Sequence, residues 1–320
     1  MTPELLVVVD TEEEFDWSAP FSREATATRS IPAQARAHEI YDRLDVVPTY
    51  VIDYPVATDP EAVRFLRGLR DAGKAEIGAH LHPWVTPPLS EAVNRRNSYH
   101  CNLPPELERA KIEALTAAIE KSFGERPTAF KAGRHGFGPN TARTIAGLGY
   151  EVDCSQLPYT DLSAEEGPDF RAVPAGPYWL GDRLLEVPLT IGFFGAAPAL
   201  GPKLGRLFDS PAAARLRLPG LLARAGLVAR SRLTPEGVSA AEQCRLIDAL
   251  ARRGQLHFTL VYHSPSLEPG HTPYVRDAAE LAAFLAALEQ VLTWFRDDLG
   301  GTFTTLSRLR REYPRSRRAA

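Results

Sequence analysis

The segment ELLVVVDTEEEFD, residues 4–16, decides the fold class of this 320-residue chain. Residues 5–9 form a short, fully apolar run rich in β-branched side chains, which is typical of a strand buried on both faces of a parallel sheet. The run passes directly into a series of acidic residues. Because active sites of parallel α/β proteins gather at the carboxyl ends of the strands, these carboxylates are placed where chemistry is expected.

The rest of the chain alternates between strand-like and helix-like periodicity. The pattern predicts further strands at residues 46–52, 75–79, 128–132, 150–154 and 256–262, with a short one near Phe303. It predicts helices at residues 32–45, 60–72, 104–123, 139–148, 239–253 and 276–298. This alternation indicates a parallel sheet, and about seven or eight such strands favour a closed or nearly closed barrel over an open sheet. We interpret residues 1–320 as one domain.

Three segments depart from this regular alternation. Residues 155–195 contain two expected strands, near 170–173 and 184–189, and residues 196–238 read as a helical excursion. Within the excursion, arginines interleave with leucines over residues 203–232. The preferred interpretation is a helical lid that packs on the barrel, and the alternative is peripheral contact with an anionic membrane. The basic tail at residues 308–320 is expected to be frayed.

Composition and charge exclude several classes of protein. The chain is 44% hydrophobic and 24% charged, as in ordinary globular proteins, and its net charge of -3 gives no basic field to recruit nucleic acid. Cys101, Cys154 and Cys244 are too few and too widely spaced for a disulfide framework or a CxxC zinc site. The first residues lack the basic start of a signal peptide, and no 18 apolar residues run together. A cytoplasmic enzyme is the expectation.

Titratable side chains follow or end five of the predicted strands. They are Asp10 and Glu12, His80 and His82, Arg134 and His135, Asp153, and His263. The carboxyl ends of parallel strands meet at one end of a barrel, so we expect these side chains to lie close together. This clustering is the strongest functional signal in the sequence.

Spacing within the first two groups indicates a metal site. Asp10 and Glu12 are two residues apart on an extended segment and therefore point the same way, and His80 and His82 share a face for the same reason. One carboxylate with two imidazoles is the ligand set of a catalytic divalent metal that keeps a position for water. The other carboxylate can then take the proton from that water. Their place directly after the buried strand favours this pair over the two glutamates that follow.

The order of these motifs resembles the polysaccharide deacetylases, the NodB-homology family of carbohydrate esterases. The matching stretches are VVDTEEEFDW (8–17), EIGAHLHPW (76–84), FKAGRHGFG (130–138), YEVDCS (150–155) and LVYHSPS (260–266). Within the family, DTEEEFDW together with HLHPW is most similar to the WalW-like branch linked to lipopolysaccharide biosynthesis. The resemblance implies a distorted (β/α) barrel of about seven parallel strands. It also implies removal of N- or O-acetyl groups with a divalent metal, most often Zn²⁺.

The resemblance assigns a role to each strand-end residue. Asp10 matches the catalytic base, and His263 matches the catalytic histidine, which acts as general acid. Arg134 matches the arginine that orients the base, and Asp153 matches the acid that tunes the catalytic histidine. The implied metal ligands are Glu12, His80 and His82, with His100 and His135 as alternatives for completing the set.

The expected substrate is an N-acetylated sugar of a polysaccharide or surface-glycan precursor. Trp17, Trp84 and Tyr159 are candidates for stacking on a sugar ring, with core packing as the alternative for each. A second reading keeps the fold but hydrolyses a small cyclic amide, as allantoinases do. A third is a carbohydrate-binding relative that performs no chemistry.

Overall fold

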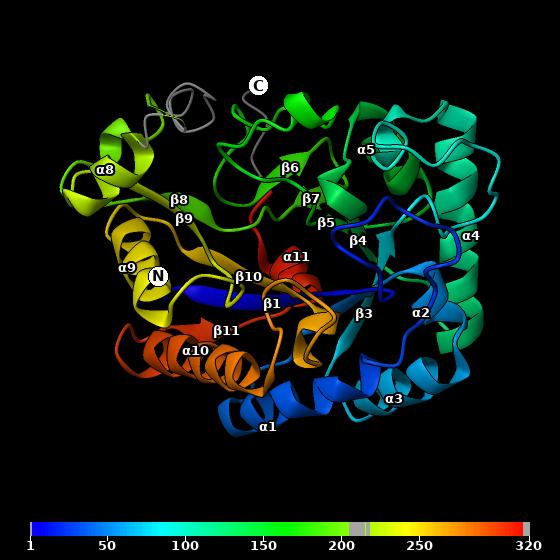
Figure 1. The fold of residues 1–320 in the computed structure, drawn as a ribbon, viewed down its shortest axis with the longest axis horizontal. Coiled ribbons are helices and arrows are strands. Elements are labelled where there is room, and N and C mark those ends of the chain that lie inside the picture. Colours follow the sequence, from blue (N-terminus) through cyan, green and yellow to red (C-terminus); the bar gives the residue numbers. More distant parts are fainter. Residues whose placement is uncertain (1, 205–214, 216–217, 316–320) are drawn as a thin grey trace.

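A parallel sheet forms the centre of the computed structural model, which describes residues 2–204, 215 and 218–315 (Figure 1). Seven strands run parallel in the spatial order β10-β1-β2-β3-β4-β5-β7. In chain order they are β1 (Glu4–Thr11), β2 (Thr49–Ile52), β3 (Glu76–Leu81), β4 (Ala129–Ala132), β5 (Val152–Asp153), β7 (Leu184–Glu186) and β10 (His257–His263). Two more strands extend this sheet: β11 (Thr302–Phe303) pairs with β1 in parallel, and β6 (Tyr178–Leu180) pairs with β7 in antiparallel fashion.

Loop residues close the barrel by joining β7 and β10, the outermost of the seven parallel strands. After β7, the Thr190 amide donates to the carbonyl oxygen of Thr259 in β10 (3.3 Å), and the Thr259 amide donates to the Thr190 hydroxyl (2.8 Å). Leu233 adds a second bridge. Its amide donates to the carbonyl oxygen of Thr190, and its own carbonyl oxygen accepts from the amide of Val261 in β10. These contacts join the two ends of the sheet without a full strand ladder. The expected distorted barrel of about seven parallel strands is confirmed.

Helices surround the barrel, because each parallel strand needs a crossover on the outside of the sheet (Figure 1). The α-helices of the regular alternation are α1 (Ala35–Leu44), α2 (Tyr54–Thr58), α3 (Pro60–Asp71), α4 (Pro105–Phe123), α5 (Pro139–Gly147), α9 (Ala240–Ala251), α10 (Ala278–Asp297) and α11 (Leu306–Glu312). Short 3₁₀ turns are η1 (Ile31–Gln34), η2 (His100–Asn102), η3 (Gly133–His135), η4 (Ser163–Glu165), η5 (Pro198–Leu200) and η6 (Ser264–Leu267). Side-chain caps start several helices: Asp53, Asp59, Ser239 and Asp277 each accept a hydrogen bond from an amide of the first turn.

Helix α10 is long and apolar enough to cross a membrane by length and composition. In the structure, however, its buried face packs on the barrel: Phe284 meets Tyr262 of β10 edge to face (5.3 Å between ring centroids), and Phe295 meets Phe258 at 5.8 Å. The buried residues Leu288, Val291 and Leu292 belong to the same core. This helix is therefore part of the outer layer of the barrel.

Two expectations outside the regular alternation differ from the structure. The segment at residues 170–173 forms turns instead of a strand, since Pro168, Pro174 and Gly176 interrupt the backbone around it, and β6 forms further along. The C-terminal tail is not frayed over its described part. Residues 306–312 form α11, which buries Leu309, and residues 316–320 lie outside the described residues.

The excursion at residues 196–238 is only partly helical. Strand β9 (Ala229–Arg232) pairs in antiparallel fashion with β8 (Ile191–Phe194), and helix α8 (Leu218–Arg224) precedes β9. Residues 205–214 and 216–217 lie outside the described part of the chain. Leu221 and Leu227 are about half exposed, at 54% and 46%, so these two leucines do not pack on the barrel as a lid would require. The β8–β9 ribbon itself forms one wall above the strand ends.

Candidate active site

A cavity of about 790 Å³ lies at the carboxyl ends of the barrel strands. Its walls come from the loop after β1, the ends of β3, β4 and β10, and the β8–β9 ribbon. Six of the seven residues predicted for metal binding or catalysis line it: Asp10, Glu12, His80, His82, Arg134 and His263. The fold therefore gathers residues that are up to 253 positions apart in the sequence.

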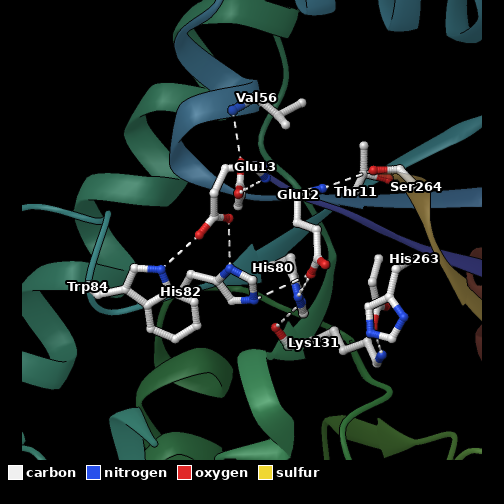
Figure 2. Close-up of polar contacts among 12 residues, drawn as sticks. Thr11, Glu12, Glu13, Val56, His80, His82, Trp84, Lys131, His263 and Ser264 are labelled. Atoms are coloured by element: carbon white, nitrogen blue, oxygen red, sulfur yellow. Dashed lines mark hydrogen bonds and ion pairs between the residues drawn. The ribbon is translucent and has the colours of Figure 1, made fainter. Parts of the chain in front are cut away.

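Glu12, His80 and His82 converge on one point. Glu12 Oε2 lies 3.5 Å from the Nε2 atoms of both histidines, and the three side chains offer ligand atoms that all lie within 4.8 Å of one another (Figure 2). All three are buried, and Glu12 Oε1 has no hydrogen-bond partner among the residues that the structure describes. Burial raises the pKa of Glu12 and lowers that of both histidines, to about 4 for His82. A buried carboxylate facing two neutral imidazoles fits a divalent cation, which would supply the missing partner.

The two alternative ligands belong to other hydrogen-bond networks. His100 is fully buried, and its Nδ1 lies 3.0 Å from Glu108 Oε1. His135 Nδ1 donates to the carbonyl oxygen of Ser155 at 3.0 Å. Among the described residues, the group that includes Glu12 contains neither of them.

Glu13 contacts His82 at Nδ1, the ring nitrogen that does not face Glu12. One carboxylate oxygen accepts a hydrogen bond from His82 Nδ1 (2.8 Å), and the other accepts from the Trp84 indole (2.8 Å), as Figure 2 shows. Asp53 in turn accepts from the Glu13 amide at 2.7 Å. Burial raises the pKa of Glu13 to about 7, although its bonds to Asp53 and Trp84 oppose the shift. A carboxylate on the far nitrogen of a metal-binding histidine fixes its tautomer and its orientation, so Glu13 prepares Nε2 of His82 to face a metal.

Lys131 is the partner of Asp10. Its ammonium nitrogen forms a short ion pair with Asp10 Oδ2, and both side chains are buried. Burial alone would raise the pKa of Asp10, but the charges of Lys131, His80 and His263 hold it below its usual range. Asp10 is therefore ionised at neutral pH, as a proton acceptor must be.

Arg134, expected to orient Asp10, lies elsewhere. It donates to the Ser98 hydroxyl (2.6 Å) and pairs with Glu165 (2.8 Å), while its guanidinium stacks on the rings of Tyr99 and Phe21. The physical reason is the backbone: Arg134 has a φ of 51°, a left-handed turn that redirects the chain just after β4. Lys131, still within β4, points inward instead and takes the position expected of the arginine.

Glu236 is the partner of His263. Its Oε2 lies 2.8 Å from His263 Nδ1, and its Oε1 accepts from the His263 amide (3.0 Å) and the Ser266 hydroxyl (2.6 Å). His263 Nε2 faces Asp10 Oδ2 at 3.8 Å. Burial lowers the pKa of His263, but Glu236, Glu12 and Asp10 together overcome this and raise it to about 9. The imidazole is therefore a protonated group next to the candidate metal site.

Asp153, expected to tune His263, performs a different task. Its carboxylate accepts from the hydroxyl (2.7 Å) and the amide (3.1 Å) of Ser155, and it faces Glu186 of β7, its neighbour in the sheet register. Burial raises the pKa of both carboxyls, and the Asp153 charge raises that of Glu186 further. Asp153 is completely buried and is not among the cavity-lining residues.

The three candidate sugar-stacking residues have different positions. Trp17 lines the cavity and meets the His263 ring edge-on, with centroids 4.9 Å apart. Trp84 also lines the cavity, but it is almost fully buried and stacks on His82 at 4.3 Å, so core packing accounts for much of its surface. Tyr159 is not among the lining residues and packs edge-on against Phe193.

Three charged residues of this site were not expected from the sequence: Glu13, Lys131 and Glu236. Lys131 carried a usable signal, since a lysine inside an apolar, buried strand is rare unless it is paired. The acidic run at residues 12–14 contained Glu13, but its side chain points away from Glu12. Glu236 lies in the loop LTPEGV (233–238), where nothing in the local pattern marks it.

The sequence matches no family model and no curated protein. Three solved structures are similar in fold. A Mycobacterium smegmatis protein proposed to be a polysaccharide deacetylase has a TM-score of 0.52 and 17% identity, covering 97% of this chain and 90% of that one. The Puue allantoinase has a TM-score of 0.52 and 15% identity, covering 96% and 89%. A GH57 branching enzyme from Thermococcus kodakaraensis, solved in complex with glucose, has a TM-score of 0.55 and 14% identity, covering 99% and 72%.

These similarities define the class of fold. The chain has the NodB-like (β/α) barrel shared by polysaccharide deacetylase-like proteins, and it carries a Glu-His-His group at the carboxyl ends of the strands. Identities of this size establish the shared fold and leave the chemistry to be argued from the site.

Proposed function

We propose that this protein is a metal-dependent hydrolase that removes the N-acetyl group from a sugar of a polysaccharide or surface-glycan precursor. The observation that carries this proposal is a matched pair of proton-transfer groups beside a candidate metal site. Asp10 is held ionised by Lys131, and His263 is held protonated by Glu236. The histidine and the aspartate face one another across 3.8 Å, next to Glu12, His80 and His82.

Glu12, His80 and His82 would hold the metal, and Zn²⁺ is the proposed ion because imidazole nitrogens and carboxylate oxygens are common zinc ligands. When bound, the metal would lower the pKa of a water molecule and polarise the acetyl carbonyl group. Glu13 keeps Nε2 of His82 directed at this position.

Asp10 acts as general base. Its carboxylate removes a proton from the attacking water as the new C–O bond forms. Lys131 keeps that carboxylate ionised and fixed in the cavity. The ion pair also limits the basicity of Asp10, so the reaction depends on a water that is already activated.

His263 acts as general acid. Its proton is given to the amide nitrogen as the C–N bond breaks, because an unprotonated amine is a very poor leaving group. Glu236 binds Nδ1, which leaves Nε2 as the nitrogen that faces the reacting group. Glu236 also binds the His263 amide and Ser266, and therefore fixes both the charge and the orientation of the ring.

The size of the cavity favours a sugar conjugate over a small cyclic amide. A volume of about 790 Å³ lies within the range of roughly 300–1,000 Å³ found for sites that hold drug-sized ligands. Such ligands are larger than allantoin, whose ring has five members, and are similar in size to a sugar conjugate. The β8–β9 ribbon forms one wall and leaves this space open beside the candidate metal site. An allantoinase-like activity is the second candidate, favoured by the similarity in fold to the Puue allantoinase.

A wider role is proposed from the sequence motifs. DTEEEFDW with HLHPW supports a WalW-like protein of lipopolysaccharide biosynthesis that works in the cytoplasm on a glycan precursor. A sugar-binding relative without activity would not need an ionised Asp10 and a protonated His263 beside a candidate metal site.

The test is acetate release by metal-loaded protein from a panel of N-acetylated sugars, with allantoin as the competing substrate. His263→Asn should lower the rate by about 10²–10⁴-fold, because it removes the general acid while keeping a polar side chain. His271→Asn is the matched control, since His271 is a loop histidine outside the cavity lining. A folded, metal-loaded His263→Asn protein that retains full turnover would contradict the proposal, as would a protein that binds no divalent metal.

A further inference from the structure

The β8–β9 ribbon ends in a tip that carries exposed leucines. We define the ribbon tip as residues 195–204 and 218–227, which include η5 and α8. Figure 1 shows α8 at one edge of the molecule, beyond the ribbon. Four large hydrophobic side chains are exposed in the described part of the chain, and three of them belong to the tip: Leu200 (48%), Leu221 (54%) and Leu227 (46%). Exposed apolar side chains are therefore concentrated at this edge.

Backbone contacts hold the two halves of the ribbon tip together. Two amides just before η5 donate to the carbonyl oxygens of Gly226 (2.8 Å) and Leu227 (2.9 Å). Gly195 permits this approach: its φ is 121°, and a Cβ there would lie 2.6 Å from the Leu227 carbonyl oxygen. The Leu227 amide in turn donates to the carbonyl oxygen of Leu222 in α8 (3.0 Å). The turn that carries Leu200 and the helix that carries the other two leucines are thus joined in one compact unit.

The inner side of the ribbon tip packs on the rest of the protein. Gly201 approaches Phe193 of β8 so closely that a Cβ would lie 2.1 Å from its ring. Phe193 is buried and packs edge-on against Tyr159, and Val228 is buried at the base of the tip. These contacts anchor the tip and leave its three leucines about half exposed. Side chains of this kind gain free energy when an apolar surface covers them.

The charge of the ribbon tip indicates what kind of surface that is. Lys203 and Arg224 are exposed, and the described residues of the tip include no Asp or Glu. In sequence, residues 195–228 contain five Lys or Arg and one Asp, although the whole chain has a net charge of -3. Leucines beside basic side chains match an anionic lipid surface, in which phosphate groups lie next to acyl chains. A second copy of the tip is a poor partner by comparison, because the two would repel each other.

We propose that the ribbon tip docks on a membrane surface that contains anionic phospholipids. The three leucines enter the boundary between headgroups and acyl chains, and the two basic side chains bind the headgroup phosphates. The other end of the ribbon walls the cavity, where Ile191 and Arg232 line it, about 10 Å along the strands from the tip. Docking therefore holds the cavity beside the membrane. This inference goes beyond the proposed deacetylase function and does not depend on it.

The test is flotation of the full chain with lipid vesicles. Vesicles of phosphatidylglycerol and phosphatidylcholine are compared with vesicles of phosphatidylcholine alone, at about 0.1 M and about 1 M salt. The Debye length falls from about 10 Å to about 3 Å between these salt concentrations. We expect binding to the anionic vesicles at the lower salt concentration, and binding at least about fivefold weaker without the anionic lipid or at the higher salt concentration.

The double variant Leu221→Gln/Leu227→Gln should weaken vesicle binding about 10-fold or more, because it removes two side chains that enter the lipid. Leu89→Gln is the matched control, since Leu89 is exposed to a similar extent (43%) in the loop after β3, outside the tip. Both proteins should fold normally, because the replaced side chains are exposed. Acetate release from a water-soluble substrate should be the same in both, so failure of the deacetylase function leaves this test intact.

Three results would overturn the inference. The first is absence of flotation with anionic vesicles at the lower salt concentration. The second is flotation that the double variant does not weaken, or that Leu89→Gln weakens equally. Such binding would come from charge alone, for which the basic residues 308–320 suffice, since Leu306 and Leu309 of α11 are buried. The third is a dimer in sedimentation velocity that the double variant abolishes, which would assign the leucines to a second copy of the chain.

Discussion

Replacing Glu236 with glutamine removes the negative charge beside His263 and keeps the length of the side chain. Glu236 Oε2 lies 2.8 Å from His263 Nδ1, and it is the largest of the interactions that raise the pKa of His263 to about 9 against the effect of burial. An opposite charge at such a distance shifts a pKa by about 1–3 units. We therefore expect the variant to lower the pKa of His263 by roughly 1–2 units.

The sign of the pH effect follows from the proposed role of His263 as a proton donor. Turnover needs the protonated ring, so the rate falls as the pH rises through its pKa. At about pH 8, a group with a pKa near 9 is roughly 90% protonated, whereas one with a pKa near 7.5 is roughly one quarter protonated. This change alone lowers the rate about fourfold at that pH, and it has little effect at about pH 6, where both forms are protonated.

The assay is the pH dependence of kcat/KM for acetate release, measured on metal-loaded protein across the neutral and alkaline range. In Glu236→Gln the fall of kcat/KM at high pH, the alkaline limb of the profile, should move to lower pH. Glu236→Asp should return this limb toward that of the unmodified protein, because it restores the negative charge beside His263. Glu242→Gln is the control: it removes another cavity carboxylate, which binds Ser231 rather than His263, and should leave the limb in place. If Glu236→Gln folds and binds metal with an unmoved alkaline limb, Glu236 does not set the charge of the general acid.

Three further substitutions test the supporting residues. Glu13→Gln should weaken metal binding about 10–100-fold in a chelator competition, because His82 loses its orienting carboxylate; unchanged affinity would argue against that role. Lys131→Met should destabilise the fold by about 3–5 kcal/mol in urea titrations at neutral pH, since the buried Asp10 loses its short ion pair and keeps only the more distant His263, at 3.8 Å, as a cationic neighbour. The loss should shrink below about pH 4, because the depressed pKa of Asp10 stabilises the folded state only where the unfolded carboxyl is ionised; a pH-independent loss contradicts the pairing. Lys111→Met should lower the free energy of unfolding by a similar amount, because this buried ammonium binds Glu91 and three carbonyl groups of the loop after β3. A loss below about 1 kcal/mol would refute this structural role.

Local sequence pattern was enough to predict the barrel and the approach of its strand-end residues. Helices and strands over the regular alternation lie within a few residues of the predicted ranges, because a buried parallel strand and an amphipathic helix each impose a recognisable period. The period of two along an extended chain also placed His80 and His82 on the same face, and the structure brings both within 3.5 Å of Glu12. Their role as metal ligands stays a prediction.

Only the tertiary structure decided which charged groups pair with Asp10 and His263. Asp10 pairs with Lys131 because strand order and register bring β4 to the same interior, while the left-handed turn at Arg134 sends that side chain toward Tyr99. His263 pairs with Glu236 because the loop from β9 to α9 folds over the end of β10. Such pairings depend on distances across the fold, and the local periodicity of a sequence carries no information about those distances. The sequence by itself determined where along the chain the candidate site residues lie, and long-range packing determined the charged partners of each of them.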